Sequence, residues 1–126
     1  MEGVKRREAH PSKRYDLEER TFEFAKNVRK FVKGLPRTIA NGEDMRQLVR
    51  ASGSVGSNYI EANDSLSKKD FVMRVKISRK EAKESRYWLR LLDTGGQEPL
   101  DSTRGALIQE ATELMNIFGA IVRKSE

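Results

Sequence analysis

Apolar residues recur at steps of three, four and seven along most of this chain, and no segment alternates apolar and polar residues over the length of a strand. Such steps place side chains on one face of an α-helix, whereas a half-buried β-strand needs alternation with period two. The clearest runs are Leu17, Phe24, Val28, Phe31 and Leu35, and Ile108, Ala111, Leu114, Met115, Phe118, Ile121 and Val122. The spacing predicts helices at about 16–34, 42–63, 68–93 and 101–124.

Residues that end or begin helices stand between these segments. Gly34 and Pro36 follow the first segment, and Ser67 precedes the third. We expect Asn41 to cap the second helix, because a side-chain oxygen there can accept from a free backbone N–H of the first turn. Four helices joined by short turns predict an all-α fold, an up-and-down four-helix bundle formed by residues 15–126.

The stretch RASGSVGSNYIEAND, residues 50–64, is rich in glycine and serine and allows three interpretations. It is a phosphate-binding loop, a flexible linker or a helix that a neighbour approaches closely. A P-loop needs a preceding strand and a lysine directly after its last glycine, and this stretch has neither. On a helical projection Ser52 and Gly56 share one face with Leu48, so we interpret the stretch as a packing helix.

The residue types that most catalytic and metal sites need are scarce. The chain has no cysteine and a single histidine, His10. Disulfides, thiolate metal sites and cysteine nucleophiles are therefore excluded, and a di-metal site built from Glu-x-x-His motifs lacks its histidines. We expect no enzyme activity, no metal and no cofactor. The N-terminus has no apolar signal-peptide core and no apolar run is long enough to cross a membrane, so we expect a cytoplasmic protein.

Positive charge is concentrated in two parts of the chain. We expect residues 1–14 to form a basic flexible arm, whose basic residues are Lys5, Arg6, Arg7, Lys13 and Arg14. Residues 67–92 carry nine lysines and arginines against three acidic residues, and this net charge of +6 equals that of the whole chain. The excess favours an anionic partner, nucleic acid first.

The third helical segment divides into three arcs on a helical projection. One arc, with Val75, Ala82 and Leu89, suits the core of the bundle. A second arc, the basic stripe, contains no acidic residue and consists of Lys68, Lys69, Lys76, Arg79, Lys80, Lys83, Arg86 and Arg90. A solvated helix face usually mixes both signs, because like charges one turn apart repel. We therefore interpret the basic stripe as a nucleic-acid-binding surface, the alternative being an ordinary solvated face.

The third arc is apolar and predicts a subunit interface. It consists of Met73, Ile77, Trp88 and Leu91. A helix in an isolated bundle needs one apolar stripe and this helix has two, so we expect oligomerisation; the alternative is a helix placed centrally in an irregular bundle. Glu81 and Glu84 lie beside this arc, and a partly buried carboxylate needs a partner. We expect Arg50 or Asn58 to supply it.

Three segments resemble the four-helix-bundle family of 23S rRNA-intervening-sequence proteins, and the resemblance covers about residues 16–124. They are LEERTFEFAKNVRKFVKGLP, QLVRASGSVGSNYIEA and SKKDFVMRVKISRKEAKESRYWLRLL. The most specific residues are Arg50, Ser54, Asn58, Glu61, Ser67, Phe71, Lys80, Glu81, Ala82, Glu84, Trp88 and Leu89. The resemblance implies up-and-down bundles assembled as a ring-shaped homopentamer. It also implies a relation to the accessory proteins of diversity-generating retroelements, which bind nucleic acid and partner a reverse transcriptase.

These features predict a non-enzymatic, oligomeric protein that binds RNA or DNA mostly through phosphate contacts. No catalytic residues are established for the family, so the resemblance implies none here. The alternative is a structural adaptor whose basic face docks an acidic protein, such as a reverse transcriptase.

Overall fold

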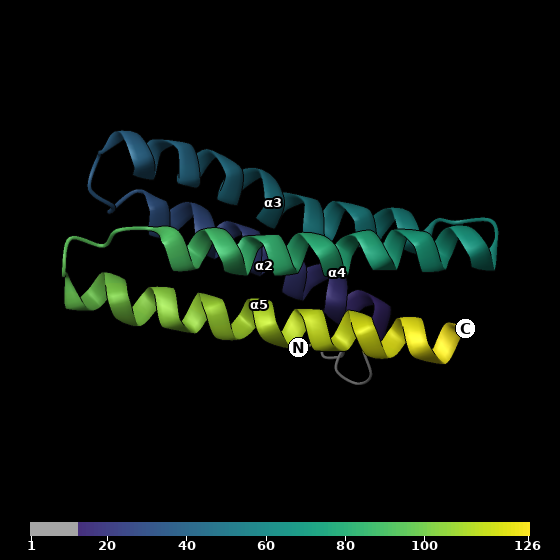
Figure 1. Cartoon of the computed structure of the whole chain (residues 1–126). Coiled ribbons are helices and arrows are strands. Elements are labelled where there is room, and N and C mark those ends of the chain that lie inside the picture. The colour runs from purple at the N-terminus through teal and green to yellow at the C-terminus, as the bar shows by residue number, and fades with distance from the viewer. Residues whose placement is uncertain (1–12) are drawn as a thin grey trace, which may run out of the picture.

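The computed structural model describes residues 13–126, with side chains from Leu17 onward. That part of the chain contains no strand and forms four helices: α2 (Lys13–Val32), α3 (Ile39–Asn63), α4 (Lys68–Leu91) and α5 (Glu98–Ser125). The helices run alternately up and down, and the turns after α2 and after α4 lie at the same end of the bundle (Figure 1). The predicted all-α four-helix bundle is confirmed.

Each corner of the bundle is occupied by one helix. α4 packs against α3 and α5, and α2 packs against the same two helices, so that α2 and α4 lie diagonally across the core and their backbones do not approach closely. The core is formed by side chains that are almost completely buried, among them Phe24, Leu48, Leu89, Leu114 and Phe118. α4 therefore has two helical neighbours, as in a regular bundle, and does not sit at the centre of an irregular one.

The first helix begins three residues earlier than the apolar spacing predicts. Lys13 and Arg14, which we expected in the flexible arm, lie in the first turn of α2. Charged residues such as lysine, arginine and glutamate have high helix propensity, so a helix can continue beyond its last apolar residue. The other arm residues Lys5, Arg6 and Arg7, and also His10, lie outside the described residues.

Asn41 has a different role from the cap that we predicted. α3 begins at Ile39 and is capped by Thr38, whose side chain accepts a hydrogen bond from the backbone N–H of Asn41. The buried Asn41 side-chain amide donates to the carbonyl oxygens of Pro36 at 2.9 Å and Asp93 at 2.8 Å, and its Oδ1 accepts from the Asp93 N–H at 3.0 Å. Asn41 thus ties the turn after α2 to the turn after α4.

The ends of α4 follow from its flanking residues. Ser67 caps its N-terminus by accepting from the Asp70 N–H at 3.1 Å, as the sequence predicts. Beyond its C-terminus, Gly95 and Gly96 have φ angles of 69° and 72°, a conformation that favours glycine. The side chain of Arg104 donates to the carbonyl of Leu92 just after the helix. The turn that reverses the chain into α5 is therefore closed by specific contacts.

Candidate nucleic-acid interface

The basic stripe lies on the part of α4 that faces solvent beside α5. Seven of its eight side chains are exposed: Lys68, Lys69, Lys76, Arg79, Lys80, Lys83 and Arg90. The eighth, Arg86, is half-buried, and its Nη1 lies 3.4 Å from the Thr112 hydroxyl of α5. Arg86 therefore contributes to the contact between α4 and α5 as well as to the positive charge of the stripe.

The middle of the basic stripe forms one wall of a groove between α4 and α5. The groove has a volume of about 370 Å³ and is lined by Lys76, Arg79, Lys80, Lys83, Gly119, Val122 and Arg123. Five of these seven residues are cations, and none is acidic. Arg123 and Gly119 are not among the residues predicted from the sequence. They lie one turn apart on α5, but only the packing of α5 against α4 shows that they face the stripe.

A second groove continues the basic surface toward the start of α4. It has a volume of about 540 Å³, and its lining includes Lys68, Lys69 and Lys76 of α4 with Ser125 and Glu126 at the end of the chain. Lys76 lines both grooves. Basic residues therefore line both grooves along the first half of α4, although Asp70 and Glu126 add negative charge to the second groove.

Few of these cations have an acidic partner. Lys76 Nζ lies 3.3 Å from a Glu126 carboxylate oxygen, and Lys80 Nζ lies 4.0 Å from Glu84. Within the described part of the chain, no carboxylate lies at ion-pair distance from the remaining cations of the stripe or from Arg123. Their charge is thus available to an anion from outside the subunit.

Two acidic residues in the middle of α5, Glu110 and Glu113, are directed away from α4 and toward α2. Arg20 of α2 binds Glu110 through two parallel hydrogen bonds of 2.7 and 2.8 Å, and its Nη2 also donates to Glu113 at 2.7 Å. These bonds raise the pKa of Arg20 above its ordinary value. A hydrogen bond from Gln109, and then the contact with Arg20, lower the pKa of Glu113. The negative charge of Glu110 and Glu113 is therefore kept away from the basic grooves, whereas Glu126 at the end of α5 lies beside Lys76.

The apolar arc of α4 is divided between the core and the surface. Met73 and Leu91 are 49% and 50% exposed, whereas Ile77 and Trp88 are partly buried. The indole Nε1 of Trp88 is buried and has no hydrogen-bond partner within residues 13–126. Trp88 also packs edge-on against the half-exposed ring of Tyr87, with the two centroids 5.0 Å apart. The arc therefore leaves two apolar side chains open to a partner.

The structure brings together three of the four residues that we expected in a polar network. Arg50 Nη2 of α3 lies 3.5 Å from Glu81 Oε1 and 3.4 Å from Glu84 Oε1 on α4. Asn58 contacts neither carboxylate: its Oδ1 accepts from Arg74 at 3.1 Å, and its amide donates to the Ser54 carbonyl at 2.9 Å. Two separate polar contacts, not one network, therefore link α3 to α4.

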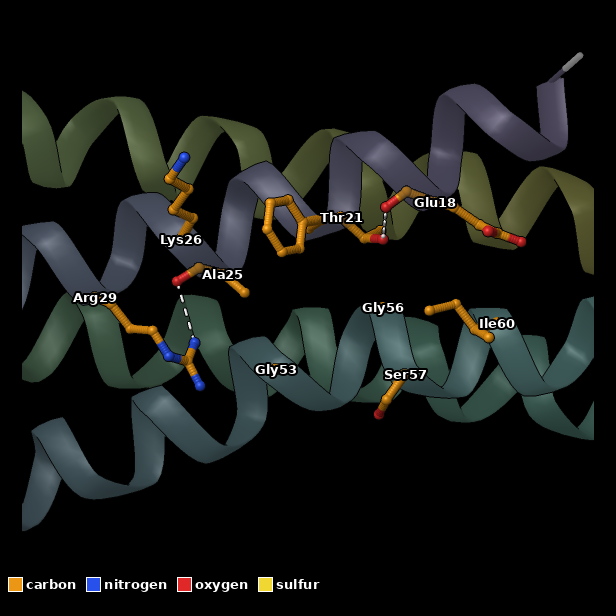
Figure 2. Close-up of a pocket in the computed structure, with 10 residues that line it drawn as sticks. Glu18, Thr21, Ala25, Lys26, Arg29, Gly53, Gly56, Ser57 and Ile60 are labelled. Carbon is orange, nitrogen blue, oxygen red and sulfur yellow. Dashed lines mark hydrogen bonds between the residues drawn. The ribbon is translucent and has the colours of Figure 1, made fainter. Parts of the chain in front are cut away.

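A groove between α2 and α3 was not predicted from the sequence. It has a volume of about 510 Å³, and its lining includes Gly53, Gly56 and the exposed apolar residues Phe22 and Ile60. Figure 2 shows Gly53 and Gly56 on α3 opposite Thr21 and Ala25 of α2. The glycine-rich stretch is therefore part of a continuous helix that packs against α2. The groove could not be predicted, because the sequence alone does not distinguish an exposed phenylalanine such as Phe22 from one in the core.

Residues 13–126 contain no group of three or more histidine, cysteine, aspartate or glutamate side chains placed to hold a metal ion. None of the four helices is both long and apolar enough to span a bilayer.

Comparisons with known proteins agree with the four-helix fold and with the family resemblance. The family model of the 23S rRNA-intervening sequence protein matches residues 13–119. A crystal structure at 1.70 Å resolution of a protein with unknown function, from the S23 ribosomal protein family of Bacteroides thetaiotaomicron VPI-5482, is similar in fold. Its TM-score is 0.70 at 25% sequence identity, over 84% of this chain and 97% of that chain. No curated protein matches the sequence.

Proposed function

The chain belongs to the family of 23S rRNA-intervening sequence proteins, and we propose that it is a non-enzymatic, oligomeric protein that binds nucleic acid through the basic stripe. The observation that carries this proposal is the groove between α4 and α5, which five cations line without one acidic residue. Like charges this close destabilise the free protein, and an anionic ligand would remove that cost. A polyanion that runs along α4 would engage several of these cations at once.

The chemistry of the stripe favours phosphates over bases. Lysine and arginine that meet phosphates fix the position of a nucleic acid but carry no sequence information. Each neutralised phosphate releases counterions, so we expect affinity to fall steeply as salt is added. We therefore propose binding that is largely indifferent to sequence, to RNA or DNA, by a protein that works in the cytoplasm.

The proposal includes assembly as a ring-shaped homopentamer, as the family resemblance implies. The half-exposed Met73 and Leu91 and the unpartnered indole of Trp88 support a subunit contact on that side of α4. Repeating the stripe in each subunit would add weak phosphate contacts through multivalency. The relation to the accessory proteins of diversity-generating retroelements belongs to the same proposal.

One observation favours a second candidate function, that of an adaptor for an acidic protein such as a reverse transcriptase. The exposed side chains of Met73, Tyr87 and Leu91 lie on the same helix as the basic stripe. A surface that combines cations with exposed apolar and aromatic groups suits a protein partner, because aromatic residues, methionine and arginine are enriched at protein interfaces.

The experiment is fluorescence anisotropy of the purified protein with a labelled structured RNA and a random-sequence DNA duplex over a salt series, with native mass spectrometry of the same sample. We expect both probes to bind and the logarithm of the affinity to fall linearly with the logarithm of salt. The absence of binding at low salt, with the oligomer intact, would contradict the nucleic-acid proposal and favour the adaptor.

A further inference from the structure

We propose that Arg79 of α4 and Arg123 of α5 form a two-arginine clamp for one phosphodiester group, closed from below by Gly119. The inference rests on the proposed nucleic-acid binding and adds a discrete anion site to a stripe that otherwise offers only dispersed charge. Its two arginines come from different helices, and Arg123 is not part of the predicted stripe.

The geometry at Gly119 brings the two guanidinium groups together. A Cβ added to this glycine would lie 3.4 Å from Arg123 Nη1 and 3.5 Å from Arg79 Nε. Both side chains therefore lie over the same point of the α5 backbone, which they reach from opposite sides of the groove. The nearest atoms to that point all belong to these two arginines. A side chain at position 119 would thus displace the arginines before it met any backbone of α4.

Two guanidinium groups that converge on one point favour a shared anion. No described carboxylate lies within ion-pair distance of either group: Glu110 and Glu113 of α5 bind Arg20 on the other side of the helix, and Glu126 pairs with Lys76. Like charges that converge without a counter-ion repel each other, and a bound anion would reverse this effect.

The chemistry of the pair selects a phosphate. The planar guanidinium fork donates two parallel hydrogen bonds, which match two oxygens of a phosphate better than a lysine ammonium does. Lys80 and Lys83 line the same groove and supply further positive charge beside it. In a nucleic acid the group that fits is a backbone phosphodiester, with its bases directed away from the glycine floor.

Gly119 allows a test that leaves every charge in place. Gly119→Leu fills the space between the arginines, and Gly105→Leu is the matched control, because nothing lies within 4 Å of a Cβ at that glycine of the same helix. We expect Gly119→Leu to weaken binding of a labelled RNA duplex about tenfold at constant salt, the loss of one charge-assisted contact. Gly105→Leu should bind as the wild type does.

A second variant keeps the test informative if Gly119→Leu does not fold. Arg79→Lys with Arg123→Lys retains the charge but removes both forks, and we again expect about a tenfold loss. Wild-type affinity in this double lysine variant would overturn the clamp. If RNA binding is then lost only when stripe lysines are neutralised, the proposed function stands without the clamp.

If the wild type binds no RNA at all, the proposed function fails and the clamp is tested alone. Inorganic phosphate is titrated at constant ionic strength while the Nε–H signals of Arg79 and Arg123 are followed by NMR. Saturable shifts of both signals, each reduced when only the other arginine is changed to lysine, would support an anion site. Signals that do not move would overturn it.

Discussion

Gly56 of α3 lies directly against Thr21 of α2, so closely that a Cβ at position 56 would be 2.8 Å from Thr21 Oγ1 and 3.1 Å from Thr21 Cβ. The Thr21 hydroxyl donates to the Leu17 carbonyl at 2.8 Å and to the Glu18 carbonyl at 3.0 Å, which holds the side chain in this position. Figure 2 shows the contact with Glu18. The glycine therefore sets the distance between the two helices, and it provides packing, not phosphate binding.

Gly56→Ala should destabilise the protein by about 1–3 kcal/mol, because overpacking at a tight contact moves the two helices apart. Gly53→Ala on the same helix is the control, since its Cβ would meet only Arg29 Nη2, at 3.5 Å. Alanine there should leave stability unchanged or raise it by up to about 1 kcal/mol through helix propensity. Urea unfolding measures both variants, and equal stability of the two would contradict the close contact.

Arg20→Gln should loosen α2 from α5, because Arg20 contacts both Glu110 and Glu113 across that boundary. We expect the free energy of unfolding to fall by about 1 kcal/mol, because the charged groups are partly exposed but Arg20 binds Glu110 through two hydrogen bonds. The pair Arg46–Glu43 at 2.9 Å is formed within one turn of α3 and is far more exposed, so Arg46→Gln should change stability very little. A larger loss in the Arg46 variant would refute this assignment.

The loss of folding stability at acidic pH should depend in part on Glu113. Its pKa is lowered from 4.5 in the folded protein, first by the Gln109 hydrogen bond and then by Arg20. A lowered folded pKa means that the charged carboxylate stabilises the fold above pH 4.5 and that this contribution is lost as the pH falls through the folded pKa. Glu113→Gln should be less stable than the wild type at neutral pH, and the difference should shrink in acid. Denaturation at several pH values tests this, and a pH-independent difference would contradict it.

Asn41→Ala should lower the free energy of unfolding by about 2–3 kcal/mol, because removal of the amide leaves backbone groups of both turns without hydrogen-bond partners. Asn41→Asp should cost more, since a carboxylate would face two carbonyl oxygens. Asn27→Ala, at an exposed position of α2, is the control and should be nearly neutral. Thermal unfolding measures all three variants, and a neutral Asn41→Ala would show that the turns are held by other contacts.

The bundle and the basic stripe could be predicted because both follow from the period of a single helix. The features that sequence missed depend on which helices become neighbours. Arg123 faces the stripe only because α5 packs beside α4, and Asn41 reaches Asp93 only because two turns meet at one end of the bundle. Arg50 or Asn58 was expected to pair with Glu81 and Glu84; Arg50 does so, whereas Asn58 accepts a hydrogen bond from Arg74.

The central claim is that phosphates bind the basic stripe, and a charge-matched comparison tests it most directly. One variant changes Lys76, Lys83 and Arg90 to glutamine. The other changes the same residue types on and just after α2, at the exposed positions Lys30, Lys33 and Arg37. Both lose three positive charges, but α2 lies diagonally across the bundle from α4.

The measurement is the slope of log affinity against log salt for an RNA duplex, with oligomer mass as the check on assembly. Each phosphate contact contributes about 0.9 to the slope on a B-form duplex, and we expect a similar contribution here. The stripe variant should therefore bind more weakly with a slope smaller by about 2–3, while the α2 variant keeps the wild-type slope. Equal losses in the two variants would mean that only net charge matters, and would contradict the account.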